Sequence, residues 1–180
     1  MGGQENFIQR LDSLFVADSK IEGPLVSSDI SGLIGQYAHG NEPSHHIVHL
    51  YNYVNQSWKT QQLIDTILHT QYFNNPNGLS GNEDCGQMSA WYVLNAMGFY
   101  QVCPGSPIYS VGRPIFDKVT INLPNGKVFE IIANNNSRTN KYIQSIRLDN
   151  ILLESPFFMH SDIMKGGKIV MEMGNTPVKQ

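Results

Sequence analysis

The 180-residue sequence has little charge and no strongly charged segment. Charged residues make up only 15% of it, with 12 Lys and Arg against 15 Asp and Glu. A protein that binds nucleic acid or an anionic membrane surface needs a cluster of basic residues, which this sequence lacks. No apolar run approaches the roughly 18–20 residues of a membrane span. We therefore expect neither nucleic acid nor a membrane to be a partner of this chain.

Several motifs of known chemistry are also missing. The sequence has no GxSxG nucleophile turn, no Walker or GxGxxG phosphate loop and no EF-hand calcium loop. The start of this chain carries no basic and then apolar signal peptide. The two cysteines, Cys85 and Cys103, do not form a CxxC metal motif. They could pair as one disulfide, but a lone cysteine commonly behaves as a small hydrophobe, which favours free, buried thiols.

What the sequence does contain is a change of periodicity near residue 102. Before it, apolar residues recur at the i, i+3, i+4, i+7 spacing of amphipathic helices. The segment 18–32, interrupted by Gly23-Pro24, is expected to be a loop, and 33–37 a short turn or helix. Ser44 is the expected N-cap of the second helix. We expect helices at 4–15, 44–54, 57–72 and 83–97.

After residue 102, apolar and polar residues alternate, which is the pattern of half-buried strands. The stretch 124–127 (PNGK) has Asn-Gly at the centre of a hairpin turn. We expect antiparallel strands at 116–123, 128–133, 142–148, 151–153 and 168–173. The predicted class is α+β, with antiparallel helix hairpins in residues 1–102 and an antiparallel β region in 103–180.

The helical part contains a glycine-bracketed acidic turn in residues 81–91 (GNEDCGQMSAW). It holds Asn82, Glu83 and Asp84, and we expect the two carboxylates at the start of a helix. The helix dipole favours ionised carboxylates there. Such a carboxylate can act as a base, as a metal ligand or merely as a cap. The pattern alone leaves these three alternatives open.

A second polar stretch, residues 40–46 (GNEPSHH), lies earlier in the chain. In an array of antiparallel helix hairpins, alternate loops emerge at the same end, so the two stretches can face one pocket. The hard oxygens of Asn41 and Glu42 suit Ca²⁺ better than Zn²⁺. A simpler interpretation is a turn that begins a helix, followed by one core histidine and one surface histidine. Because adjacent helical residues point about 100° apart, His45 and His46 do not easily face the same point.

Longer motifs together resemble a known family. Residues 40–46, 58–60, 78–92, 98–100 and 104–107 closely resemble the C-terminal part of the family 92 glycoside hydrolases, which are calcium-dependent exo-acting α-mannosidases, mostly specific for α-1,2 linkages. The resemblance extends over the whole chain. It implies that the helices are part of an (α/α)₆ barrel and that the strands form a β-sandwich-like region.

The resemblance also implies an inverting hydrolysis, in which one carboxyl group protonates the leaving oxygen and another activates water. Asp84 matches the position of the family's base. Many members carry a second Asp where this chain has Asn82, so this departure removes a charge partner of the base. The positions expected to bind Ca²⁺ are Asn41 and Glu42, and those expected to contact the sugar are His45, His46 and Glu83.

By the same resemblance, the general acid lies upstream of this chain in a longer protein. We therefore expect the chain by itself to be catalytically weak or inactive, and to self-associate through uncovered apolar helix faces. Its expected partners are a mannose-containing oligosaccharide and the N-terminal part of the enzyme, and the full-length protein is expected to be periplasmic or secreted. The alternatives are a stand-alone carbohydrate-binding module, in which the β part binds the sugar, and a purely structural remnant.

Overall fold

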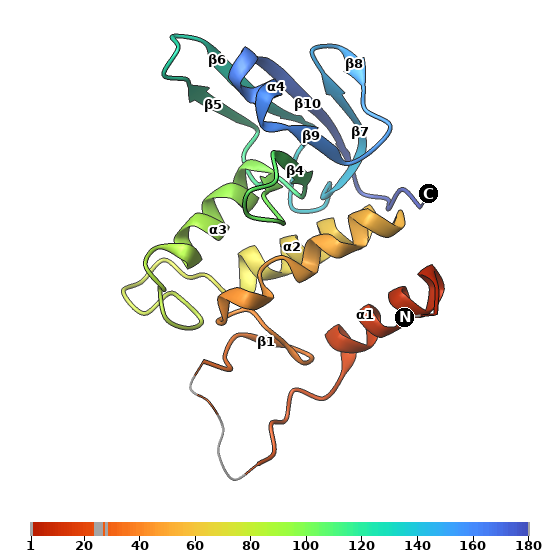
Figure 1. The fold of residues 1–180 in the computed structure, drawn as a ribbon, viewed down its shortest axis with the longest axis vertical. Coiled ribbons are helices and arrows are strands. Elements are labelled where there is room, and N and C mark those ends of the chain that lie inside the picture. The colour runs from red at the N-terminus through yellow and green to blue at the C-terminus, as the bar shows by residue number, and fades with distance from the viewer. Residues whose placement is uncertain (1, 24–26, 28, 180) are drawn as a thin grey trace.

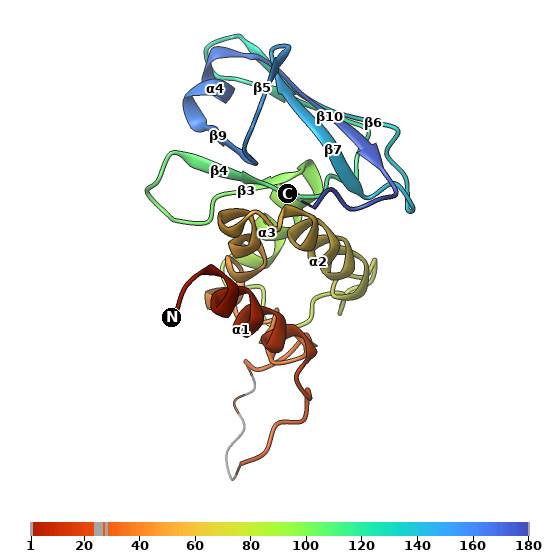
Figure 2. The same cartoon turned by 90° about the vertical axis from the view of Figure 1, so that its right-hand side faces the viewer.

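The three longest helices and the two larger sheets occupy opposite ends of the molecule (Figure 1). The computed structural model describes residues 2–23, 27 and 29–179. The expected loop at 18–32 is therefore described only in part, since 24–26 and 28 lie outside the described residues. Figure 2 shows a small sheet lying between the helices and a larger sheet. The predicted α+β class is confirmed.

Three α-helices form the helical half, namely α1 (Gln4–Val16), α2 (Ser57–Thr70) and α3 (Gln87–Met97). Their apolar faces enclose a core that includes Ile64, Ile67 and Trp91, all fully buried. The apolar spacing predicted α1 and α2 closely, because each helix buries one face and exposes the other.

The α-helix expected at 44–54 is wrong in type. The chain forms two 3₁₀ helices, η1 (Glu42–Ser44) and η2 (Ile47–Val54), so Ser44 ends η1 and does not cap a longer helix. A 3₁₀ helix aligns side chains at i and i+3. His49 and Asn52 have this spacing, are both buried, and lie 3.1 and 2.7 Å from the hydroxyl of Ser110. We attribute the tighter helix to these two buried polar contacts.

A two-residue hairpin replaces the turn or helix expected at 33–37. Strands β1 (Leu33–Ile34) and β2 (Tyr37–Ala38) pair antiparallel around Gly35, which has a positive φ of 61°. A Cβ atom on Gly35 would lie 2.4 Å from the carbonyl oxygen of Leu14. The hairpin forms here because its glycine turn fits tightly against the C-terminal end of α1.

The β half has two sheets that share one core. The larger sheet has the order β5-β6-β10-β7-β8 and the smaller one the order β3-β4-β9. The strands of the larger sheet are β5 (Lys118–Asn122), β6 (Val128–Asn134), β7 (Tyr142–Leu148), β8 (Ile151–Leu152) and β10 (Gly167–Gly174). Those of the smaller sheet are β3 (Phe99–Tyr100), β4 (Ile108–Val111) and β9 (Phe157–Met159). Phe129, Ile169 and Phe158 are among the residues that both sheets bury between them.

The expectation of a purely antiparallel region is wrong for one pair of strands. β10 runs parallel to β6, with Ile169 opposite Ile131, and antiparallel to β7. The short helix α4 (His160–Lys165) precedes β10. It brings the chain back to the end of the sheet at which β6 begins, so β10 and β6 run in the same direction. The alternation of side chains has the same period in parallel and antiparallel strands, so it could not reveal the direction.

Paired strands and buried polar contacts join the two halves. β3 and β4 pair across the predicted boundary between residues 102 and 103. In addition, Asp65 of α2 lies 3.0 Å from Nε of the buried Arg113, and Gln61 of α2 accepts a hydrogen bond from the backbone of Ile143 at 3.0 Å. These contacts fix the position of the helices relative to the sheets.

The two cysteines differ from the expected buried thiols. Cys85 and Cys103 are both free, but both are exposed, because each lies in a loop and not on a buried helix face. Within the described part of the chain, no helix is long and apolar enough to cross a membrane.

Candidate functional site

The acidic turn lies before α3 and not within its first turn, which corrects the helix start expected at Glu83. α3 begins at Gln87, and the preceding Asp84, Cys85 and Gly86 have φ values of 54°, 55° and 94°. These three consecutive left-handed residues coil the chain so that the amide of Gln87 donates to the carbonyl of Asp84 at 3.1 Å. The turn is therefore a distinct loop that presents its own side chains.

Glu83 turns back onto α3. Its two carboxylate oxygens accept hydrogen bonds from the backbone amide and the hydroxyl of Ser89, both at 3.0 Å. A carboxylate in this position satisfies one of the unpaired amides of the first helical turn and interacts favourably with the helix dipole. Of the two acidic residues, Glu83 is thus the one that caps the helix, and Asp84 has no such contact among the described residues.

The two polar stretches lie against each other. A Cβ atom on Gly81 would lie 2.6 Å from the carbonyl oxygen of Gly40, and one on Gly40 would lie 2.0 Å from that of Ser80. Glycine is required at both positions because the two backbones approach so closely. The hydroxyl of Ser31 also donates to the carbonyl of Ser80 at 2.5 Å. The structure therefore brings the two stretches together, as expected for alternate loops of helix hairpins.

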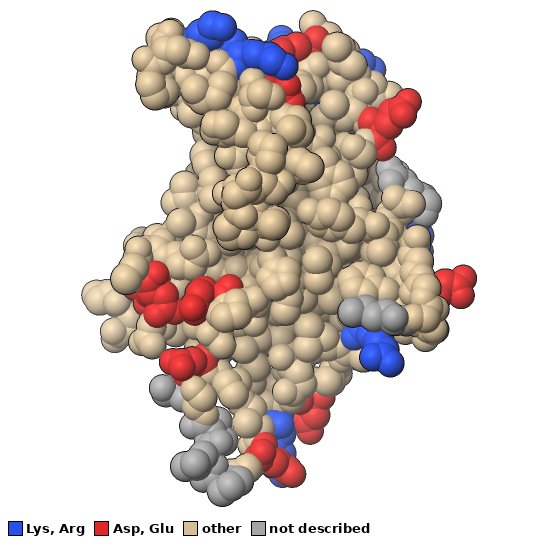
Figure 3. All heavy atoms as spheres, viewed as in Figure 1, with Lys and Arg blue, Asp and Glu red and all other residues tan. Residues whose placement is uncertain are grey.

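This approach brings Asp84 next to Glu42. Desolvation, and then the charge of Glu42 and a hydrogen bond to it, raise the pKa of the exposed Asp84 above its ordinary value, with further effects from Asp29 and Glu83. Figure 3 shows acidic side chains gathered at the edge of the molecule that carries the loop before α3. Neighbouring carboxylates of this kind favour a bound cation and strengthen the affinity of Asp84 for a proton.

Two buried histidines, His39 and His45, lie directly before and within the stretch 40–46. His39 lies 2.9 Å from the hydroxyl of Tyr37 through Nδ1 and 2.7 Å from that of Tyr72 through Nε2. Nε2 of His45 lies 3.0 Å from the carbonyl oxygen of His39, and the two rings stack with 4.9 Å between their centroids. His46, in contrast, is exposed. The interpretation of His45 as a core residue and His46 as a surface residue is therefore the one that the structure matches.

The hydrogen-bond partners determine the tautomer of both rings. The hydroxyl of Tyr72 donates to the carbonyl of Met88 at 3.1 Å, so it accepts from Nε2 of His39. Nε2 of His45 must also carry its proton, because the carbonyl of His39 can only accept. Burial lowers the pKa of His39 to about 3 and lowers that of His45 as well. His39 is therefore neutral at pH 7, and in neutral His45 the free acceptor is Nδ1.

That acceptor positions the side chain of Gln87. Nε2 of Gln87 lies 3.1 Å from Nδ1 of His45 and donates to the hydroxyl of Tyr100 at 3.1 Å. Its carbonyl oxygen Oε1 has no hydrogen-bond partner among the described residues. Gln87 and Tyr100 both line a cavity of about 330 Å³. The cavity is also lined by Glu42, Pro43, His45, His46, Gln101, Val102 and Pro104.

This combination of a carboxylate pair and a polar cavity can be compared with known proteins. Residues 1–175 match the glycosyl hydrolase family 92 catalytic domain. This chain belongs to glycosyl hydrolase family 92.

Solved relatives of this family 92 chain share its fold along nearly all of its length. It is 42% identical to a family GH92 α-mannosidase from Bacteroides thetaiotaomicron, solved in complex with mannoimidazole, with a TM-score of 0.91 and coverage of 98% of this chain and 23% of that one. It is 39% identical to an inverting family GH92 mannosidase from the same organism, with a TM-score of 0.83 and coverage of 98% and 25%.

A curated fungal relative is more distant. An uncharacterized secreted glycosidase from Arthroderma benhamiae is 27% identical over 177 residues, which are 97% of this chain and 21% of that protein. The family 92 chain therefore spans only about a quarter of the length of the relatives that it matches.

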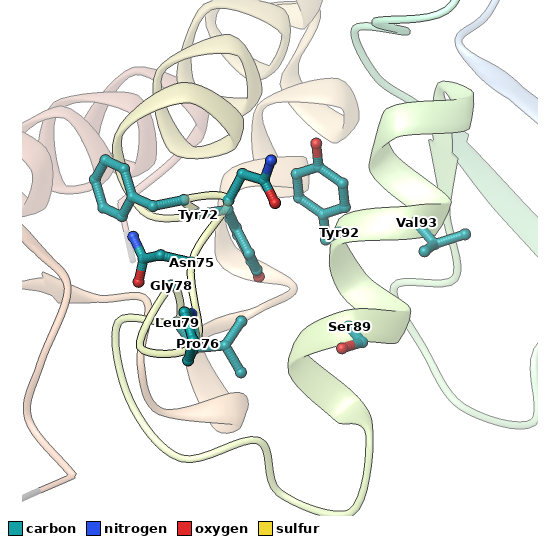
Figure 4. A pocket seen from close by; sticks show the side chains of 10 residues that line it. Tyr72, Asn75, Pro76, Gly78, Leu79, Ser89, Tyr92 and Val93 are labelled. Carbon is teal, nitrogen blue, oxygen red and sulfur yellow. The ribbon is translucent and has the colours of Figure 1, made fainter.

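A second cavity, of about 470 Å³, borders α3 at Ser89, Tyr92 and Val93 and has a different lining. Figure 4 shows Tyr72 and the turn that follows it facing Ser89 and Tyr92 of α3 across this cavity, which Val93 also lines. Phe73 and Val93 are more than half exposed along it. It is larger than the cavity beside Gln87, but no carboxylate or histidine lines it. We therefore take the smaller cavity as the candidate site.

The sequence pointed to some of the residues at this site and missed others. Of the expected metal ligands, Asn41 is half-buried and Glu42 is exposed beside the cavity, while Asn82 is exposed next to Asp84. Gln87 and Tyr100 were not predicted as functional residues, because a single Gln or Tyr has no diagnostic spacing. The position of Gln87 directly after the acidic turn was the one available signal.

Proposed function

We propose that this chain is the C-terminal part of a calcium-dependent, inverting exo-α-mannosidase that acts mostly on α-1,2-linked mannose of N-glycans. The supporting observation is the contact between Asp84 and Glu42, which belong to separate stretches and meet beside a polar cavity. Inverting glycosidases place two carboxyl groups on opposite sides of the sugar, roughly 6.5–9.5 Å apart, so that water fits between the base and the sugar.

In this proposal Asp84 is the general base. It projects from a loop of three left-handed residues and is open to water, and its pKa is raised by desolvation and then by its carboxylate neighbours. A base removes a proton from water most effectively when its pKa lies close to the working pH. Asn82 is neutral, so in the ion-free chain the carboxylates of Glu42 and Asp29 contribute to raising the pKa of Asp84 in place of a second Asp.

His46 and Gln87 bind the terminal mannose in this proposal, and His45, whose ring nitrogens already bond to His39 and Gln87, contributes by holding Gln87 in place. Because Nε2 of Gln87 is held by His45 and Tyr100, Oε1 is available to accept a hydrogen bond from a sugar hydroxyl. A side chain held in this way loses little conformational entropy when the sugar binds. Glu83, with both carboxylate oxygens bonded to Ser89, supports the sugar site by holding the acidic turn in place.

Asn41 and Glu42 are the proposed ligands of Ca²⁺. No group of three or more His, Cys, Asp or Glu residues in the described part of the chain is arranged as a metal site. The available donors are an amide oxygen, a carboxylate and backbone carbonyls, which is the donor set that suits calcium, with water or sugar hydroxyls completing its shell. When bound, the ion would act as a template and electrostatic stabiliser for the sugar hydroxyls.

The general acid and the rest of the barrel are proposed to come from further parts of a longer protein. The exposed apolar side chains of Phe73 and Val93 support this proposal, because uncovered patches of this kind mark surfaces that pack against another segment or another copy. The chain alone would then hydrolyse mannosides weakly or not at all. A longer protein of this family would be secreted or periplasmic, in line with the name of the fungal relative.

Calorimetry with Ca²⁺ and then mannose tests this function. We expect the chain to bind Ca²⁺, and to bind mannose more tightly when Ca²⁺ is present. Glu42→Gln should abolish both effects, because it replaces a charged donor with a neutral one. Glu5→Gln, at an exposed position of α1, is the matched control and should change neither.

Three results would count against the proposal. Ca²⁺ binding that persists in Glu42→Gln would show that Glu42 is not a ligand and that the ion binds at another site. Mannose binding that survives both Glu42→Gln and Asp84→Asn, but fails when the β half is altered, would instead favour a carbohydrate-binding module. Hydrolysis of α-1,2-mannobiose by this chain at the rate of full-length relatives would contradict the proposal that the general acid lies upstream of it.

A further inference from the structure

One face of α3 connects the candidate site with the core of the helical half. Gln87, Trp91 and Asn95 follow one another at intervals of four residues, so they lie on the same side of this helix. Gln87 lines the cavity of the candidate site, whereas Trp91 and Asn95 are fully buried behind it. Both buried residues carry polar groups, and the partners of these groups show what the two residues hold in place.

Trp91 holds His45. Its indole Nε1 donates to the carbonyl oxygen of His45 at 3.0 Å, and Nε2 of the His45 ring lies 3.0 Å from the carbonyl oxygen of His39. The main chain and the ring of His45 are thus each fixed by one hydrogen bond. Nδ1 is the remaining polar atom of this ring, and it accepts from the side-chain amide of Gln87 at 3.1 Å. A shift of His45 would therefore move one of the two acceptors of the Gln87 amide.

The indole ring of Trp91 lies at the centre of an aromatic cluster. The ring of His39 meets it edge-on, with 4.4 Å between the centroids, and the ring of Tyr72 stacks parallel to it at 6.1 Å. The rings of His45 and Tyr100 lie at 5.7 and 6.3 Å. A side chain packed on several sides in this way has little freedom to change its rotamer. The direction of the Trp91 N–H is therefore fixed by the core.

Asn95 supports the second acceptor of the Gln87 amide. Its Oδ1 lies 2.9 Å from Nε2 of the fully buried His49, and its Nδ2 donates to the carbonyl of Trp91 at 2.9 Å. The ring of His49 stacks on that of Tyr100, with 5.3 Å between the centroids and 22° between the planes. The hydroxyl of Tyr100 accepts from Gln87 at 3.1 Å. Asn95 thus fixes the ring on which this acceptor rests.

We propose that Trp91 and Asn95 are positioning residues of the candidate site, each of which holds one of the two acceptors of the Gln87 amide. Neither residue lines the cavity. Because both amide protons of Gln87 are engaged, its Oε1 keeps one direction and remains the acceptor for a sugar hydroxyl. The inference rests on the proposed function and extends it from the residues that touch the sugar to those that orient them.

NMR of the Gln87 side-chain amide tests the positioning role in the sugar-free chain. Trp91→Phe keeps an aromatic ring but removes the N–H donor, so it should shift the amide proton that bonds to His45. Asn95→Leu should instead shift the proton that bonds to Tyr100, because it leaves the ring beneath that tyrosine without its partner. Each variant therefore has its own expected signature.

Ile67→Val is the matched control. Ile67 is fully buried in the same core, and its apolar side chain makes no hydrogen bond, so this substitution loosens the packing alone. It should leave both amide protons of Gln87 unchanged. The proposal is refuted if Trp91→Phe and Asn95→Leu also leave them unchanged. It is equally refuted if Ile67→Val shifts them as much, since general loosening of the core would then explain the effect.

Mannose titration in the presence of Ca²⁺ tests the consequence for binding. Trp91→Phe should weaken mannose binding roughly twofold to tenfold, which is the range of one hydrogen bond. In a Gln87→Ala background it should cause no further loss, because it acts through Gln87. Equal losses in both backgrounds would overturn the positioning role and leave the mannose site in place. If the wild-type chain binds no mannose, the proposed function is refuted, while the sugar-free amide shifts still decide whether Trp91 and Asn95 position Gln87.

The wild-type chain offers a further measurement that needs no variant to fold. The sequence has two tryptophans, so the indole N–H of Trp58 serves as an internal reference. It donates to Oε1 of Gln56 at 3.0 Å, and Trp58 does not line the cavity. Mannose should shift the indole signal of Trp91 and leave that of Trp58 in place. Bound mannose with an unmoved Trp91 signal would overturn the proposal.

Discussion

The helical half and the β half of this chain bury different kinds of side chains. In the helical half, His39, His45, His49, Asn52 and Asn95 are all buried and linked by hydrogen bonds. Among the described residues, the buried side chains of the larger sheet are apolar, and Ser110 is the one buried polar side chain in the strands of the smaller sheet. Apolar packing tolerates many side chains of similar volume, whereas a buried polar network requires particular partners.

The half that buries polar side chains is also the half that carries the candidate site. A site that binds a sugar needs donors and acceptors held at fixed positions, and a network such as His39–His45–Gln87 provides them. The β half contributes the smaller sheet, which carries Tyr100 into the site on β3, and a rigid base for the rest. We therefore expect substitutions in the two halves to differ in cost even when the change in side-chain volume is small.

The largest effect should come from the ion pair that joins the halves. Arg113→Met removes the 3.0 Å partner of the Asp65 carboxylate, which is about nine-tenths buried and retains Lys141 at 3.4 Å. Breaking a buried pair from one side costs roughly 3–5 kcal/mol of unfolding free energy, and we expect the lower end of that range because Lys141 still compensates part of the desolvated charge. Urea unfolding measures this loss.

Lys118→Met is the control for that prediction. It breaks the exposed pair between Lys118 and Glu130 in the larger sheet, and should cost less than about 1 kcal/mol. Equal costs for the two variants would mean that the junction between the halves contributes no more than a surface contact.

Acid should destabilise the helical half through its buried histidines. His49 is fully buried between Asn95 and Ser110, and burial lowers its pKa to about 4. The unfolded chain, with a histidine pKa of about 6.5, binds this proton first, so stability is lost as the pH falls from about 6.5 to about 4. The shift corresponds to roughly 3 kcal/mol from this one residue.

His49→Gln should flatten this part of the pH profile. Glutamine can donate to Asn95 and accept from Ser110 but does not titrate. The measurement is the urea midpoint of wild type and variant from pH 7 to pH 4. If the two curves stay parallel over this range, the inference that His49 is buried in its neutral form is wrong.

One substitution of similar shape in each core tests directly whether the polar and the apolar core differ in their tolerance of change. Asn95→Leu leaves the Nε2 proton of His49 unpaired, at a cost of roughly 1–3 kcal/mol. Met171→Leu in the fully buried sheet core should cost less than about 1.5 kcal/mol, since it conserves volume and removes no hydrogen bond. Thermal unfolding of both variants would refute the comparison if Met171→Leu proved the more costly.

The smallest expected effect is on a single pKa. Glu42→Gln should lower the pKa of Asp84 toward its ordinary value, because it removes the carboxylate that interacts most strongly with Asp84. Asp29→Asn should lower it less, and Glu83→Gln least. Carboxyl-carbon NMR titration measures all three. An unchanged pKa in Glu42→Gln would show that the two stretches do not share a site.

The sequence predicted the elements whose signal is local. The apolar stripes of α1 and α2 and the Asn-Gly turn between β5 and β6 each specify one conformation within a short window. The direction of β10 and the 3₁₀ form of η2 depend on contacts with residues far away in the chain, such as Ser110, and could not be predicted in this way.

The same distinction applies to the site. Asp84 and Glu42 could be chosen because carboxylates in loops that face the same pocket are chemically distinctive. The roles of Gln87 and Tyr100 depend on the tautomer of His45, which in turn depends on the carbonyl of His39. No local pattern encodes such a chain of contacts. The capping of α3 by Glu83 also became clear only once the helix start was placed at Gln87.

We propose that the sugar binds at the loops of the helical half. NMR of the side-chain amide of Gln87, recorded while mannose is added in the presence of Ca²⁺, is the sharpest test of this location. We expect shifts of this amide and of the backbone amides at 42–46 and 84–87, with little change in the larger sheet. Shifts confined to β5, β6 and β10, with the Gln87 amide unmoved, would contradict it.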